Sequence, residues 1–146
     1  MALVEADLRH RGLTRLLGLG GQPGLSDALL NGHAEPALSG SGTPGLDVVA
    51  AGRVDAAASE LLGGERFDRI LAGLDVERDL VLIDLPPSGR PELEAIAPKL
   101  DGLLIACEEN ACRRSAVRSA RERIERAGGA VLGSVLLAAN GRGDGA

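Results

Sequence analysis

Two short aliphatic runs in this sequence each end on acidic residues, and this repeated pattern constrains the fold more than any other feature. The first run, residues 2–4, leads into Glu5-Ala6-Asp7, and the second, residues 80–83, leads into Asp84 and Pro86-Pro87. A continuous aliphatic run is typical of a strand that is buried on both faces of a parallel sheet. Because ligands of open parallel sheets bind beyond the carboxyl ends of the strands, we expect these carboxylates at a ligand-binding edge.

Further strand and helix patterns alternate along the rest of the chain. The remaining expected strands are residues 46–50, residues 102–107, which form another buried strand, and residues 130–137. Three of the expected helices are residues 13–19, residues 91–96 and residues 112–127. A fourth is expected to begin at a cap formed by Ser26 or Asp27 and to end at Leu30. A fifth is expected to begin at a Ser59 cap and to run to Leu74, with a break at Gly63-Gly64. Residues 34–45 are expected to form a loop. This order predicts an α/β fold of three layers, αβα, with a mostly parallel sheet between helices.

Composition and length narrow the class of protein. The 146 residues are enough for one domain, expected over residues 1–140, with a disordered tail at 141–146. A hydrophobic content of 45% supports an aliphatic core, and a net charge of −5 argues against general nucleic-acid affinity. No apolar run approaches the roughly 18–20 residues of a membrane span, and no signal peptide follows Met1, so we expect a cytoplasmic protein.

The two cysteines do not indicate a metal site. Cys107 and Cys112 are spaced C-x4-C, and the sequence has only two histidines to complete a zinc ligand set. We expect a buried small residue at Cys107 and a residue at the start of a helix at Cys112, in a reducing compartment.

The acidic strand ends have two interpretations. Clustered carboxylates at such an edge suit a hydrated Mg²⁺ ion, which takes one or two acidic ligands together with phosphate oxygens. An aspartate that ends a hydrophobic strand can equally be a helix cap or a turn former. Asp84-Leu85-Pro86-Pro87 after four aliphatic residues is the more specific of the two patterns.

These motifs resemble those of the bacterial P-loop tyrosine kinases of capsule and exopolysaccharide synthesis. Residues 80–87 resemble the Walker B motif of that family, and residues 5–9 resemble its second acidic motif, Asp-x-Asp-x-Arg, with Glu at the first position. Further segments follow the family's order and spacing, namely residues 13–19, 23–27, 44–48, 59–62, 101–104 and 113–116. The resemblance extends to about Leu137 and implies a P-loop NTPase fold of the Mrp/MinD-like type.

The resemblance also implies roles for four residues. Asp7 would assist deprotonation of the acceptor tyrosine, Glu5 and Asp84 would hold Mg²⁺, and Glu5, Arg9 and Asp84 would face the nucleotide. The implied cofactors are ATP and Mg²⁺. Such a set is chemically reasonable, because phosphoryl transfer depends on positioning and charge neutralisation, with a carboxylate accepting the hydroxyl proton.

The sequence departs from the family pattern at four points. It has no Gly-x-x-x-x-Gly-Lys-Ser/Thr loop, and its single lysine, Lys99, lies on no glycine-rich segment. Glu5 replaces the usual Asp, Leu137 stands where the family often has an Asn, and the chain has no tyrosine. We therefore expect a fold that misses its P-loop strand through truncation upstream of Glu5, is inactive as it stands and is marginally stable.

The expected function is that of a tyrosine-protein-kinase-like protein of capsular or exopolysaccharide biosynthesis and export. The implied partner is a membrane chain-length-determining protein, a polysaccharide co-polymerase, which would recruit the chain to the inner face of the plasma membrane; self-association stays open. One alternative is a non-catalytic regulatory module of the export machinery. Another is a fragment of a ParA/MinD-type partitioning or cell-division ATPase.

One helix is unusually rich in arginine. Its basic residues are Arg113, Arg114, Arg118, Arg121, Arg123 and Arg126. The simpler interpretation is the solvated face of an amphipathic helix, and the functional one is contact with an acidic partner or an anionic surface.

Overall fold

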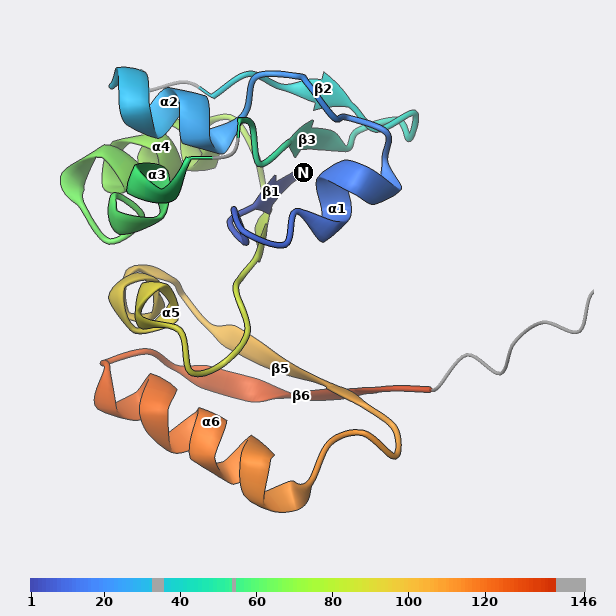
Figure 1. Cartoon of the computed structure of the whole chain (residues 1–146), viewed down its shortest axis with the longest axis vertical. Helices are drawn as coiled ribbons and strands as arrows, with labels where there is room; N and C mark the ends of the chain where they lie inside the picture. The colour runs from blue at the N-terminus through green and yellow to red at the C-terminus, as the bar shows by residue number, and fades with distance from the viewer. Residues whose placement is uncertain (33–35, 54, 139–146) are drawn as a thin grey trace, which may run out of the picture. The chain divides into compact units, whose positions relative to one another are not determined.

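A computed structural model of the chain describes residues 1–32, 36–53 and 55–138 (Figure 1). In chain order the elements are β1 Ala2–Glu5, α1 Gly12–Leu16, α2 Leu25–Asn31, β2 Ser39–Gly40, β3 Asp47–Val49, α3 Ala56–Glu60, α4 Glu65–Val76, β4 Val81–Asp84, α5 Pro91–Ile96, the 3₁₀ turn η1 Ala97–Lys99, β5 Leu103–Glu108, α6 Arg114–Arg126 and β6 Val131–Leu137. They divide into two compact units, Met1–Glu92 and Leu93–Ala146.

The first unit is built on a four-stranded sheet with the order β2-β3-β1-β4. β1 is parallel to both β3 and β4, whereas the two-residue strand β2 is antiparallel to β3. Ala2 and Val4 are fully buried, as expected of small and branched aliphatic side chains on a central strand. The position of β1 between β3 and β4 brings its acidic carboxyl end into the middle of the sheet edge.

The helices of the first unit pack around a core of large apolar side chains. The fully buried members are Phe67, Leu25, Leu29, Leu62 and Ile70. Phe67, Ile70 and Leu74 are the buried residues of α4, and this confirms the helical spacing expected there. The guanidinium of Arg66 on α4 donates to the carbonyl oxygens of Leu29 and Leu30 at 2.7 and 3.0 Å, so it also covers the open end of α2.

The second unit is a parallel pair, β5 and β6, with α6 packed on it (Figure 1). Leu103 and Cys107 of β5 are buried, and so are Ala120 and Ile124 of α6. On the other face of this pair, Leu104, Val135 and Leu137 are exposed at 59%, 43% and 50%.

Two of the expected helix starts are wrong. α2 begins after Gly24, not after Ser26 or Asp27, because the Asp27 carboxylate reaches back to accept from the Gly24 N–H at 3.0 Å. Ser59 lies inside α3, whose cap is Asp55, with the Asp55 carboxylate accepting from the Ala57 N–H. The break expected at Gly63-Gly64 is confirmed, since Gly64 is the N-cap of α4.

The strands at residues 80–83 and 102–107 were expected to be buried, and this is only partly correct. β4 alternates half-buried and exposed residues, with Leu82 at 50% exposure, so one of its two faces is open to solvent. Among the strands described, the ladders form two sheets and not the expected one, and β4 pairs with β1 alone. The segment at 34–45, expected to be a loop, contains the short strand β2.

The tail expected at residues 141–146 lies outside the described residues. Among the residues that are described, no helix combines the length and the apolar character needed to cross a membrane.

Candidate functional site

The carboxyl ends of β1 and β4 bring together three of the acidic residues predicted from the sequence. The register of the two strands sets Glu5 directly opposite Asp84. The Asp84 carbonyl oxygen then accepts hydrogen bonds from the N–H groups of Ala6 and Asp7, at 2.8 and 3.2 Å. The chain therefore leaves β1 along the end of β4, and Glu5, Asp7 and Asp84 all lie at one edge of the sheet.

Asp84 is the solvent-facing member of this acidic edge, and its side chain is exposed. Partial burial, followed by the charges of Glu5 and then Asp7, raises the pKa of Asp84 above its usual value. Burial disfavours the charged carboxylate by removing water from it, and the adjacent carboxylates disfavour one another's charged form as well. A bound cation at this edge would relieve the same repulsion.

Glu5 is fully buried, and its carboxylate accepts hydrogen bonds from the first residues of α1. Oε1 accepts from the Leu13 N–H and Oε2 from the Thr14 N–H, each at 2.8 Å. The Thr14 hydroxyl also donates to Oε2 and accepts from the Ala51 N–H at 2.9 Å. A buried carboxylate is tolerated only when it is well hydrogen-bonded, and these contacts meet that requirement. Glu5 thus links β1, α1 and the end of β3.

Asp7 is 8% exposed, and its carboxylate is paired with the side chain of His10. Asp7 Oδ1 accepts from the His10 N–H at 3.1 Å, and Asp7 Oδ2 lies 2.8 Å from His10 Nδ1. The three-residue spacing within a turn is the signal that could have identified this pair. The side chain of His10 is 58% exposed to solvent.

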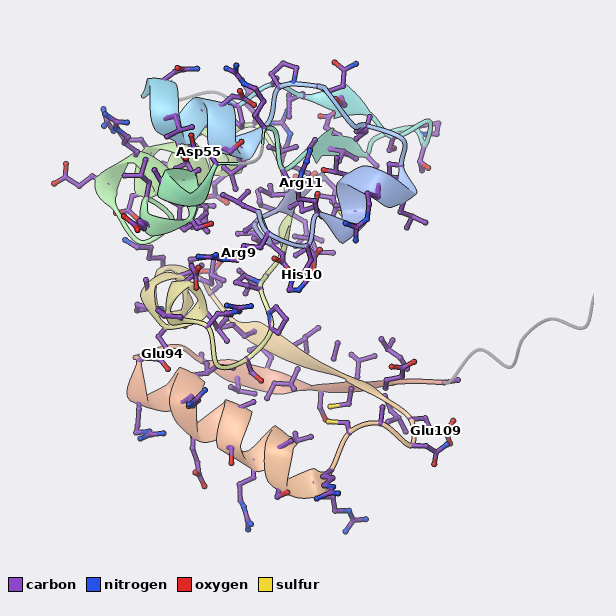
Figure 2. All side chains as sticks on the ribbon, in the orientation of Figure 1. Arg9, His10, Arg11, Asp55, Glu94 and Glu109 are labelled. Atoms are coloured by element: carbon purple, nitrogen blue, oxygen red, sulfur yellow. The ribbon has the colours of Figure 1, made fainter. Side chains whose placement is uncertain are left out.

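Arg9 extends from the same turn and forms an ion pair within the first unit (Figure 2). Its Nε and Nη2 donate to Glu92 Oε1 at 3.2 and 3.1 Å. The other carboxylate oxygen, Glu92 Oε2, is buried and has no hydrogen-bond partner in the described part of the chain. Arg9 thus uses Nε and Nη2 to bind Glu92, and one of the two Glu92 carboxylate oxygens lacks a hydrogen bond in the described residues.

The acidic edge fits a magnesium ion better than a transition metal. Within residues 1–32, 36–53 and 55–138, no three His, Cys, Asp or Glu side chains are placed to enclose a metal ion. Mg²⁺ needs only one or two carboxylates and takes its remaining ligands from water and phosphate oxygens. Asp84 has an accessible carboxylate for this purpose, whereas both oxygens of Glu5 already accept hydrogen bonds.

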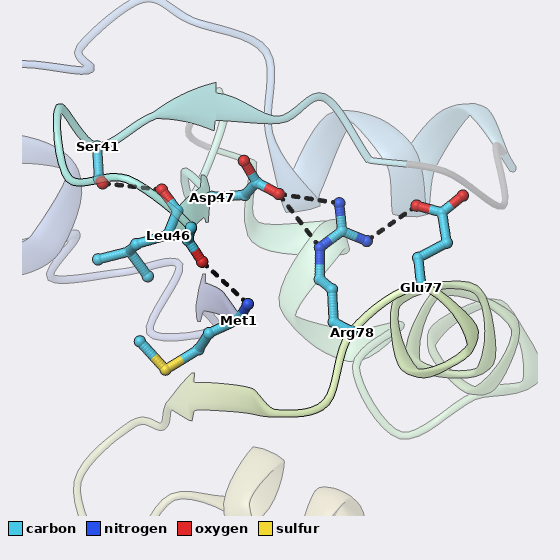
Figure 3. A network of polar contacts seen from close by, with 7 residues as sticks. Met1, Ser41, Leu46, Asp47, Glu77 and Arg78 are labelled. Atoms are coloured by element: carbon cyan, nitrogen blue, oxygen red, sulfur yellow. Dashed lines mark hydrogen bonds and ion pairs between the residues drawn. The ribbon is translucent and has the colours of Figure 1, made fainter.

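Two other charged clusters in the first unit hold the scaffold together. Asp27 accepts from the Arg53 Nε at 2.7 Å and from the Gly24 N–H, which joins α2 to the loop after β3. Arg78, with a side chain only 9% exposed, donates to Asp47 Oδ2 through Nη2 at 3.1 Å and bridges to Glu77 (Figure 3). Both clusters lie outside the acidic edge, and their contacts are internal.

No protein-family model matches the chain. The tyrosine-protein kinase Ptk of Acinetobacter johnsonii is 38% identical to it over 87 residues, which cover 58% of this chain and 12% of that protein. The tyrosine-protein kinase CpsD of Streptococcus agalactiae is 28% identical over 142 residues, covering 94% of this chain and 62% of that protein. The chain thus spans less than two thirds of the length of either relative.

Two solved structures are similar over almost the whole chain. The VpsO kinase domain superposes with a TM-score of 0.85 at 25% identity, covering 95% of this chain and 70% of the other. The kinase domain of the Escherichia coli tyrosine kinase ETK superposes with a TM-score of 0.84 at 26% identity, covering 99% of this chain and 58% of the other. These likenesses confirm the predicted three-layer α/β fold class.

Proposed function

We propose, from the premise that this chain belongs to the bacterial tyrosine-kinase family, that its acidic edge is the metal and acceptor side of a phosphotransfer site. The observation that carries the proposal is the convergence of Glu5, Asp7 and Asp84 at the ends of β1 and β4, with the pKa of Asp84 raised by burial and by its two acidic neighbours. Adjacent carboxylates at this location are suited to a divalent cation that also binds phosphate.

The three carboxylates would have different tasks. Asp84 is the direct magnesium ligand, since its carboxylate is exposed. Glu5, whose oxygens hold the start of α1, supports the metal through its negative charge and by fixing the turn that follows β1. Asp7 accepts the proton of the attacking tyrosine hydroxyl, the role of a general base in phosphoryl transfer.

Arg9 completes the proposed site on the nucleotide side. Its guanidinium is paired with Glu92 through a single carboxylate oxygen, so it retains donors for a phosphate. The cofactors are ATP and Mg²⁺. The sequence contains no Gly-x-x-x-x-Gly-Lys-Ser/Thr loop, so these 146 residues offer no loop of that kind to hold the β- and γ-phosphates. By themselves these residues would bind nucleotide weakly and transfer no phosphate.

The proposed setting is capsular or exopolysaccharide synthesis and export. The partner would be a membrane chain-length-determining protein, a polysaccharide co-polymerase, which would recruit the chain to the inner face of the plasma membrane. Self-association through the kinase fold is part of the same proposal. We further propose that residues 1–140 constitute the kinase-like domain.

A second candidate function is a non-catalytic module that docks on the export machinery or on a complete kinase. It is favoured by the internal contacts of Glu5 and Arg9, whose side chains hold α1 and Glu92. A ParA/MinD-type ATPase gains no comparable support, because the similar proteins named above are tyrosine kinases.

Calorimetric titration of the chain with ATP, with and without Mg²⁺, tests the proposal. We expect weak binding that requires Mg²⁺, is lost in Asp84→Asn and persists in Asp7→Asn, because only Asp84 ligates the metal. Asp75→Asn, which removes an exposed carboxylate from α4, is the matched control and should bind as the unmodified chain does.

Binding of equal strength without Mg²⁺ or in Asp84→Asn would contradict the assignment of Asp84. Complete absence of binding would favour the non-catalytic module, and micromolar affinity would exclude it.

A further inference from the structure

The second unit contains a pair of thiols brought together by one tight loop. Cys107 lies on β5, is 7% exposed and faces α6, whereas Cys112 lies in the loop before α6 and is exposed. The N–H groups of Ala111 and Cys112 both donate to the Glu108 carbonyl oxygen, at 3.2 and 3.1 Å. This turn folds the chain back at the end of β5, so that Cys107 and Cys112 line the same pocket.

Both cysteines also line one open pocket of about 550 Å³. Its other walls include Arg113 and, from the first turns of α6, Ser115 and Ser119, with Glu108 on the strand side. The pocket therefore exposes a thiol next to a guanidinium, hydroxyl groups and the amino end of a 13-residue helix. Such surroundings favour a small ligand that carries carboxylates.

We propose that Cys107 and Cys112 are a redox-active dithiol that forms an intrachain disulfide by exchange with a small anionic disulfide of the oxidised-glutathione class. The inference goes beyond the proposed kinase function and does not depend on it. It rests on the pocket that both cysteines line, the turn that brings Cys112 back beside the end of β5, and the exposure of Cys112.

The exchange proceeds in two balanced steps. The Cys112 thiolate attacks one sulfur of the small disulfide, so that a mixed disulfide forms and one small thiolate leaves and takes up a proton. The Cys107 sulfur, after losing its proton to solvent, attacks the Cys112 sulfur and releases the second small thiol. In total the protein loses two protons and two electrons, and the small disulfide gains them and becomes two thiols.

The order of attack follows from exposure. Cys112 is the thiol that a reagent can reach, whereas Cys107 is covered by α6. Burial, with the hydrogen bond to the neighbouring thiol as the next cause, raises the pKa of Cys107. A buried thiol with a raised pKa reacts slowly with a reagent in solution, so Cys107 is suited to attack the mixed disulfide after Cys112 has formed it.

The disulfide would join the end of β5 to the start of α6 through a short ring. Because the entropy removed from the unfolded chain grows with loop length, we expect only a small gain in stability from so short a loop. The main effects would be a loop held in one conformation and two sulfurs closed to further reagents.

The test uses the full chain with oxidised glutathione, followed by thiol counting and mass spectrometry under non-reducing conditions. We expect the unmodified chain to lose both free thiols and the mass of two hydrogen atoms, with no adduct and no dimer. Cys107→Ser should stop at a stable glutathione adduct on Cys112, and Cys112→Ser should react slowly, since its remaining thiol is buried.

The charge of the reagent provides a second readout. Arg113→Glu should slow the reaction with oxidised glutathione several-fold and leave the reaction with cystamine, a cationic disulfide, as fast or faster. A glutathione adduct on Cys112 as the end product of the unmodified chain, or a dimer linked through Cys112, would overturn the proposal.

Discussion

At the scale of single residues, the buried carboxylate of Glu5 illustrates how one side chain serves the fold and the site together. It accepts hydrogen bonds from the Leu13 and Thr14 N–H groups and from the Thr14 hydroxyl, while its charge acts on Asp84. A glutamate is one methylene longer than the aspartate expected by resemblance. In this structure that length is used to reach the amino end of α1.

Truncation of Glu5 should therefore destabilise the fold before it affects any chemistry. Glu5→Ala leaves the start of α1 and the Thr14 hydroxyl without their acceptor, for an expected loss of about 2–4 kcal/mol in the free energy of unfolding. Urea denaturation followed by circular dichroism measures it. Glu5→Gln, which keeps one acceptor oxygen, should lose less, and equal losses in the two variants would contradict the hydrogen-bonding account.

Glu5 stabilises the fold, whereas the ionised carboxylate of Asp84, whose pKa is raised, destabilises it. A carboxyl group whose pKa is higher in the folded state than in the unfolded state favours folding when protonated, so its charge opposes folding at neutral pH. Asp84→Asn should therefore raise the melting temperature at pH 7, and the gain should shrink as pH falls through the folded pKa of Asp84. Melting curves between pH 7 and pH 4 measure it; a gain that is constant with pH would count against this account.

At the scale of elements, the loop after β3 is fitted against the start of α2 so closely that only glycine is accommodated. Gly52 has φ +83°, and a Cβ there would lie 2.5 Å from Asp27 Oδ2 and from Ser26 Oγ. Gly52→Ala should cost about 1–2 kcal/mol from the left-handed backbone alone, and more from the contact. Gly20→Ala, with open space around its position, is the control that should change the unfolding free energy little.

The same junction should give the chain an acid-sensitive contact. Burial acts to raise the pKa of Asp27, but hydrogen bonds from Arg53 and Gly24, with the charge of Arg53, outweigh it and lower the pKa below the usual value. The contact stabilises the fold fully when the pH is above the pKa that Asp27 has in the unfolded chain. It is lost as the pH falls through the lower pKa that Asp27 has in the folded chain. Asp27→Asn should be destabilising at pH 7 and close to neutral near pH 2; an effect independent of pH would exclude the charged contact.

At the scale of the whole molecule, the division into two compact units predicts unfolding in more than one step. β4 is an edge strand with Leu82 half exposed, and the β5–β6 pair leaves Leu104 largely open to solvent. We expect a broad thermal transition below about 60 °C, with a van't Hoff enthalpy that differs from the calorimetric enthalpy. Scanning calorimetry measures both, and one sharp two-state transition above that temperature would contradict the expectation.

Much of the secondary structure could be predicted because its signals are local. The aliphatic runs before Glu5 and Asp84 became β1 and β4, and the periodic apolar residues around Phe67 became α4. The helix starts at Ser26 and Ser59 were wrong because several residues near each start could serve as caps, and tertiary contacts such as that of Asp27 with Arg53 selected among them.

The α/β class and the positions of Glu5, Asp7 and Asp84 at strand ends follow from the amino-acid sequence, because side-chain periodicity and the polar ends of apolar runs depend on neighbouring residues. Three further features emerge only in the folded chain: Glu5 supports α1 while Asp84 faces solvent, His10 pairs with Asp7, and Cys112 lines the same pocket as Cys107. Those outcomes depend on strand register and on the conformations of turns. Both arise from contacts among many residues, and no short segment of the sequence specifies them.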